Sequence, residues 1–218
     1  MERDDFLASI RRSLTTGRLP QVDTTDPGLL VPDLEDADLA RHFSMALEQA
    51  DGVAHEEDPI EVITGIAARL DTRRFVSWDA DHLPVPNLIE RLERQGLSRV
   101  DHNHGHTGDG RRRRVEDYGD LRLGITGAEA GFAETGSVVV RSGKGRPRMA
   151  SLIPSVHVVL LRSAAIHRSL AHWAAMMAPE MATATNVVFI SGPSRTGDIE
   201  MRLNTGVHGP GEVHVVLV

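Results

Sequence analysis

"RFVSWDADHLPVPNLIERLERQGLSRVDHN", residues 74–103, carries the clearest indication of the fold. Its first five residues are mostly apolar or β-branched and predict a strand. "PNLIERLERQ", residues 86–95, spaces its apolar residues as a helix does, and "SRVDHN", residues 98–103, predicts a second short strand. A strand, a helix and a strand in succession are typical of a βαβ unit in a parallel sheet.

The same alternation continues on both sides of this stretch. Before it, "GVAHEE" (52–57) predicts a strand, and helices are expected from Asp36 to about residue 50 and over 59–70. After it come four strand patterns: "SVVVRS" (137–142), "HVVLLRS" (157–163), "NVVFISG" (186–192) and "EVHVVLV" (212–218). Dense valine runs fit strands that are covered on both faces. The predicted fold class is α/β, an open and mostly parallel sheet with flanking helices.

An N-terminal arm is expected ahead of this domain. Residues 4–14 have helical spacing, and a linker rich in Pro, Gly, Thr and Asp follows, so residues 1–35 are predicted as helix plus linker and 36–218 as the α/β domain. The helix either docks on a second copy of the chain or on another partner, or it frays.

Composition excludes several classes of function. A net charge of -7 argues against a nucleic-acid partner. The absence of Cys excludes disulfides, thiolate nucleophiles and Cys-ligated iron–sulfur clusters within this chain. No apolar run approaches the ~18 residues of a membrane span, and the charged N-terminus lacks the apolar core of a signal peptide. We therefore expect a cytoplasmic protein.

"ISGPSRTGDIE", residues 190–200, is the first candidate site. We expect the preceding strand to end at the carboxyl edge of the sheet, with Thr196 as N-cap of a helix over "GDIEMRL". Backbone N–H groups, Ser194, Thr196 and Arg195 would then offer donors to a carboxylate or phosphate. In the alternative, the stretch is only a tight turn in which Asp198 complements the helix dipole.

"GITGAEAGFAETGSVVV", residues 124–140, is the second candidate. Glu134 stands just ahead of the turn Thr135, Gly136 and Ser137, where a carboxylate can serve as a general base or a nucleophile. In the alternative, Glu134 caps local amides of a hairpin.

Other polar residues give weaker indications. His102, His104 and His106 predict a mobile loop rather than a metal site, because the glycines among them disfavour a fixed ligand geometry. Arg146 and Arg148 could pair with Glu134 or with an acidic ligand. His208 lies in a Gly/Pro turn and is either a ligand-binding residue or a turn residue.

Three blocks together resemble a known family. "GAEAGFAETGSVVV" (127–140), "RMASLIPSVHVVLL" (148–161) and the stretch from Ile190 to Val218 are similar, in this order, to the LUD-domain family and its lactate-utilization protein C branch. The resemblance implies a fold related to sugar-phosphate isomerases and CoA transferases. It also implies a role in the oxidation of L-lactate to pyruvate beside two iron–sulfur partner proteins, so that the clusters lie outside this chain. A Glu is the nucleophile in CoA transferases of this fold, which makes Glu134 the candidate catalytic residue by analogy.

The leading hypothesis is a component of an L-lactate utilization system. The loops Glu134–Ser137 and Ser194–Asp198 would line a cleft for a small anion, with Arg195 on its carboxylate and Glu134 on its hydroxyl. The alternative is a stand-alone isomerase or acyl/CoA transferase that uses Glu134. A structural or regulatory module without a ligand is a third candidate.

Overall fold

The computed structural model describes residues 5, 7–8, 38–101, 118–171, 173–174, 186–197 and 203–218, without the side chains of 196–197 and 203–205. Most of the predicted N-terminal helix and linker lie outside these residues, so the boundary near residue 35 stays a prediction. The three histidines of the 102–106 loop and Asp198 are outside them as well.

A six-stranded parallel sheet confirms the predicted α/β class. Its order is β1-β12-β7-β4-β2-β3. The strands are β1 (Val53–His55), β12 (Glu212–Leu217), β7 (Val156–Leu161), β4 (Leu123–Gly127), β2 (Arg74–Ser77) and β3 (Ser98–Arg99). All neighbours pair in parallel. Every residue of β4 and β7 is buried, as expected for central strands covered on both faces.

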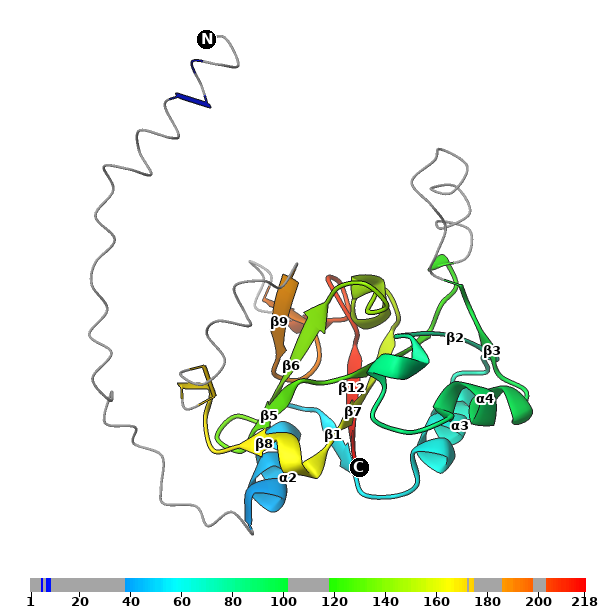
Figure 1. Ribbon diagram of the computed structural model, residues 1–218, viewed down its shortest axis with the longest axis horizontal. Helices are drawn as coiled ribbons and strands as arrows, with labels where there is room; N and C mark the ends of the chain where they lie inside the picture. The colour runs from blue at the N-terminus through cyan, green and yellow to red at the C-terminus, as the bar shows by residue number, and fades with distance from the viewer. Residues whose placement is uncertain are drawn as a thin grey trace. The chain divides into compact units, whose positions relative to one another are not determined.

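Among the described residues, the α-helices with defined bounds are α2 (Leu39–Gln49), α3 (Pro59–Arg69) and α4 (Leu88–Arg94). Asp58 starts α3, because its carboxylate accepts a bond from the Ile60 amide at 2.7 Å and Pro59 needs no N–H partner at the first helical position. In Figure 1, α3 and α4 lie on one side of β7 and β12, and β6 and β9 lie on the other. The short 3-10 helices are η2 (Ala80–His82), η3 (Arg148–Ser151) and η4 (Ser163–Ala165).

Two of the predicted strands belong to a second sheet. Its order is β8-β5-β6-β9, formed by β8 (Ile166–His167), β5 (Ala130–Phe132), β6 (Ser137–Ser142) and β9 (Asn186–Ile190). β6 is antiparallel to both β5 and β9. The expectation that β9 ends at the carboxyl edge of the parallel sheet was therefore wrong, since β9 is not a strand of that sheet.

The prediction of a helix over residues 197–203 was also wrong, because its first and last residues lie in strands. Residues Arg195–Gly197 form β10, which pairs antiparallel with β11 (Leu203–Thr205). Thr196 lies opposite Asn204 within this hairpin, so Thr196 is not a helix N-cap. Strand pairing replaces the helical start that a Thr followed by acidic residues favours.

Candidate functional site

The two sequence motifs come into contact through hydroxyl groups. Ser137 Oγ lies 2.6 Å from Ser191 Oγ, and Thr135 Oγ1 lies 2.8 Å from Ser137 Oγ. Ser137 is 5% exposed, while Glu134 and Thr135 are exposed to solvent. A chain of hydrogen-bonded hydroxyls therefore joins the start of β6 to the end of β9.

Two glycines allow these turns to pack on the last turns of α2. Gly136 has φ of 63°, and a Cβ at this position would lie 2.1 Å from the Leu47 amide nitrogen. Gly192 has φ of 97°, and its Cβ would lie 2.2 Å from the Ala50 carbonyl oxygen. Only glycine combines this backbone conformation with so close an approach.

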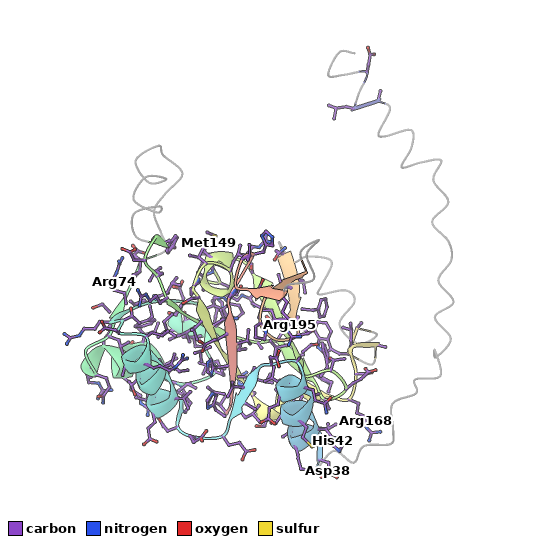
Figure 2. All side chains as sticks on the ribbon, turned by 180° about the vertical axis from the view of Figure 1, so that it is seen from behind. Asp38, His42, Arg74, Met149, Arg168 and Arg195 are labelled. Carbon is purple, nitrogen blue, oxygen red and sulfur yellow. The ribbon has the colours of Figure 1, made fainter. Side chains whose placement is uncertain are left out.

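The motif of residues 190–200 lies at the amino edge of the parallel sheet, not at its carboxyl edge. Arg195 forms an ion pair with Asp51, which immediately precedes the turn into β1. The Ser194 amide donates to the Pro210 carbonyl, just before β12, at 2.8 Å. Figure 2 shows Arg195 beside the C-terminal strands and Arg74, on β2, toward the other side of the sheet. His208 is exposed in the turn between β11 and β12.

In these positions, several of the predicted ligand-binding groups already contact other residues of the chain. Arg195 is already neutralised by Asp51, and the hydroxyls of Thr135 and Ser137 bond each other. A role for these residues, and for Glu134, in ligand binding stays a prediction.

At the carboxyl edge of the parallel sheet, the strand order reverses between β2 and β4. From β2 the chain passes through α4 to β3, on one side. From β4 it passes through β5 and β6 to β7, on the opposite side. Such a reversal of strand order is where open α/β sheets bind their ligands.

Glu129, two residues after the end of β4, binds the side chains of two arginines at this reversal point. Its Oε1 accepts from Arg141 Nε at 3.1 Å and from Arg146 Nη1. The three side chains keep between 20% and 25% of their surface exposed, so the cluster is partly buried and open to solvent on one side. From the sequence, Arg146 was expected to pair with Glu134 or with an acidic ligand, whereas its partner in the structure is Glu129.

Residues directly after β2 complete the cluster. The Arg146 guanidinium carbon lies 5.8 Å from the ring centre of Trp78, and the Asp79 amide donates to the Gly145 carbonyl at 2.8 Å. Arg99 binds Asp79 Oδ1 at 2.6 Å. Sequence reasoning missed Trp78 and Asp79, although polar residues that directly follow a buried strand are a usable indication of a carboxyl-edge site.

A buried polar pair joins the two central strands of the parallel sheet. Thr126 Oγ1, on β4, is 2.9 Å from His157 Nε2 on β7. His157 is fully buried, and this burial lowers its pKa to about 3, so the imidazole is neutral at ordinary pH. It therefore contributes a hydrogen bond between the two strands without adding charge.

A histidine pair occupies the other half of the sheet. His55 Nε2 lies 2.9 Å from His214 Nδ1, and His214 Nε2 lies 3.2 Å from Glu212 Oε2. Burial lowers the pKa of both imidazoles, and the bond from Arg69 lowers the pKa of Glu212. In the described part of the chain, no group of three or more His or acidic residues is arranged to hold a metal ion.

A pocket of about 450 Å³ lies at the amino edge, between the ends of α3 and α4 and the starts of β2 and β3. None of the predicted site residues that the structure describes lines it. Of the helices that can be described, none has the length and apolar character needed to cross a bilayer.

Comparisons with known proteins place the chain in a family. The model of the LUD domain matches residues 30–218. A lactate utilization protein C from Halalkalibacterium halodurans is 32% identical over 157 residues, which cover 69% of this chain but only 64%, less than two thirds, of that protein. Another from Shouchella clausii is 27% identical, over 95% of this chain and 93% of that protein.

A solved structure agrees with the fold. The crystal structure of a DUF162 family protein from Deinococcus radiodurans matches with a TM-score of 0.57 and 19% identity, over 85% of this chain and 99% of that chain. At this identity the likeness concerns the fold alone. From the domain match and its relatives together, the chain belongs to the LUD-domain family, in its lactate utilization protein C branch.

Proposed function

We propose that this chain is a component of an L-lactate utilization system and binds a small anionic ligand at the carboxyl edge of its parallel sheet. The names of the relatives from Halalkalibacterium halodurans and Shouchella clausii support the first part. The observation that carries the second part is the reversal of strand order between β2 and β4, with Glu129, Arg141 and Arg146 beside it.

Electron transfer would depend on partner proteins. Oxidation of L-lactate to pyruvate releases two electrons, and a chain without Cys supplies no thiolate ligands for an iron–sulfur cluster. Iron–sulfur proteins of the same system are therefore the proposed partners. In this arrangement the chain binds and orients the hydroxy acid, and the partners accept the electrons.

Growth on L-lactate tests this proposal. A strain that lacks the gene should fail to grow with L-lactate as the sole carbon source, grow normally on pyruvate, and recover when the full chain is restored. A tagged chain should copurify with iron–sulfur proteins, and the purified assembly should oxidise L-lactate. Normal growth of the deletion strain on L-lactate would count against the role.

The isomerase or CoA-transferase alternative predicts a different result. The isolated chain would then convert a sugar phosphate or a CoA ester without added subunits, and Glu134→Gln would abolish that turnover. Glu134 is exposed on the turn between β5 and β6, at the opposite end of these strands from Glu129 and Arg141.

A further inference from the structure

Counted over the residues that the structure describes, the cluster around Glu129 has an excess of one positive charge. Arg141 and Arg146 share the single carboxylate of Glu129, and all three side chains are at least three quarters buried. The nearby Arg99 has Asp79 as its own partner. A partly buried cluster with unbalanced charge is stabilised by a counterion, and one monoanion would neutralise this one.

Two buried N–H groups in the same cluster find no acceptor among the described residues. Trp78 Nε1 and Arg146 Nε make no hydrogen bond within the described part of the chain. Trp78 is only 2% exposed, and its ring lies under the Arg146 guanidinium, at 5.8 Å. Because buried donors are nearly always paired in folded proteins, these two point to a ligand or water that carries acceptor oxygens. A carboxylate has two such oxygens and fits the fork of an arginine.

Glu129 adds selectivity for a hydroxyl. Both of its hydrogen bonds from described residues reach Oε1, on one side of the carboxylate. An ionised carboxylate only accepts hydrogen bonds, so Oε2 suits a ligand group that donates one. A hydroxyl next to a bound carboxylate meets this requirement, whereas a methyl group or a keto oxygen does not.

We infer that Trp78, Arg141 and Arg146 bind the carboxylate of a small 2-hydroxy acid, and that Glu129 accepts the hydrogen bond of its 2-hydroxyl group. This inference rests on the proposed function and deepens it, because it names the residues and the ligand class at the reversal point between β2 and β4. The charge of the cluster selects a monoanion, and Glu129 selects a hydroxy acid over a simple carboxylate.

Tryptophan fluorescence gives a direct test, since Trp78 and Trp173 are the two tryptophans of the chain. Trp173 packs with Phe132 and Phe189 in a separate aromatic group, so Trp173→Phe leaves Trp78 as the only reporter. The full chain with this change is titrated with L-lactate, acetate and inorganic phosphate. L-lactate should alter the Trp78 emission with a Kd at least about tenfold below those of acetate and phosphate, as a charge-assisted hydrogen bond provides.

Variants of Arg146 and Glu129 separate the binding of the carboxylate from the recognition of the hydroxyl group. Arg146→Gln should raise the Kd for L-lactate at least about tenfold, and Arg146→Lys should give an intermediate value because Lys keeps the charge without the fork. Glu129→Gln should tighten acetate binding and remove the preference for L-lactate, since it removes a competing negative charge and the acceptor. Arg41→Gln is the matched control, because Arg41 is an exposed residue of α2 that pairs with Asp38.

Several results would overturn the inference. They are an emission of Trp78 that does not respond to L-lactate, an equal or higher affinity for phosphate, or an unchanged Kd in Arg146→Gln. If Arg146→Gln does not fold, as judged by circular dichroism, an unchanged Kd in Arg146→Lys has the same meaning. The site would be rejected and the proposed function kept if the deletion strain cannot grow on L-lactate but L-lactate does not change the Trp78 emission. A responsive Trp78 with normal growth of that strain would reject the function and keep the site.

Discussion

Ser137 and Ser191 share a hydrogen bond of 2.6 Å although 54 positions separate them in the chain. The bond ties the first residue of β6 to the residue that follows β9, and Thr135 extends it by a further hydroxyl. Through Gly136 and Gly192 the same segments pack on α2. This junction therefore holds the second sheet against the helix that leads into β1.

Ser137→Ala should destabilise the fold by about 1–2 kcal/mol, because it removes a buried hydroxyl and leaves two others without that partner. Ser191→Ala should cost less, since Ser191 is exposed and water can replace the lost bond. Urea unfolding of both single variants and the double variant measures the coupling. We expect a coupling of about 0.5–1 kcal/mol, and strictly additive losses would contradict the shared bond.

Gly136→Ala should destabilise the fold by roughly 2 kcal/mol or more, because the new Cβ would collide with the backbone of α2 at a residue with positive φ. Gly143→Ala is the matched control, because a Cβ there meets no atom within 4 Å. Thermal unfolding of both variants gives the comparison. Equal melting temperatures for the two would show that the turn is not packed on Leu47 as described.

Local patterns were sufficient for the parallel sheet and its helices. "RFVSW" became β2, the helix expected over 59–70 became α3, and the valine runs after Ser155 and Gly211 became β7 and β12. These elements are decided by the burial of nearby apolar residues, which the sequence displays directly. The parallel arrangement followed because strands and helices alternate over this part of the chain.

Local sequence patterns do not show which distant strands pair with each other. "SVVVRS" and "NVVFI" are as rich in valine as β7, yet they form an antiparallel pair in the second sheet. Because β9 belongs to the second sheet, the loop predicted to bind an anion lies at the amino edge of the parallel sheet. In the same way, Arg146 was expected to pair with Glu134 or with an acidic ligand, but it pairs with Glu129, because it faces the other end of the β5–β6 hairpin.

The stability of the fold should fall as the pH drops below about 6.5, the ordinary pKa of histidine. Burial lowers the pKa of His157 to about 3, and it also lowers those of His55 and His214. At pH values between 3 and 6.5 the unfolded chain therefore binds more protons than the folded chain, so acidification favours unfolding. The stabilisation is complete above pH 6.5 and is lost toward the lowered pKa values.

His157→Gln should flatten this dependence, because a glutamine can bond Thr126 but does not titrate. One proton fewer in the transition corresponds to a slope smaller by about 1.4 kcal/mol per pH unit. Urea unfolding of both proteins at several pH values from 4.5 to 7 gives the slopes. An identical slope in the variant would mean that His157 is already protonated or accessible in the folded state.

Glu134→Gln should support growth on L-lactate as the wild-type chain does, whereas Arg146→Gln should not. Glu134 is exposed, and β6 separates its turn from the cluster that contains Arg146. Complementation of the deletion strain with each variant, with protein levels checked by immunoblot, compares the two positions directly. If Glu134→Gln fails to grow and Arg146→Gln grows normally, the ligand site belongs at the turn Thr135–Ser137, and Glu134 regains the role of base or nucleophile that its place before this turn first indicated.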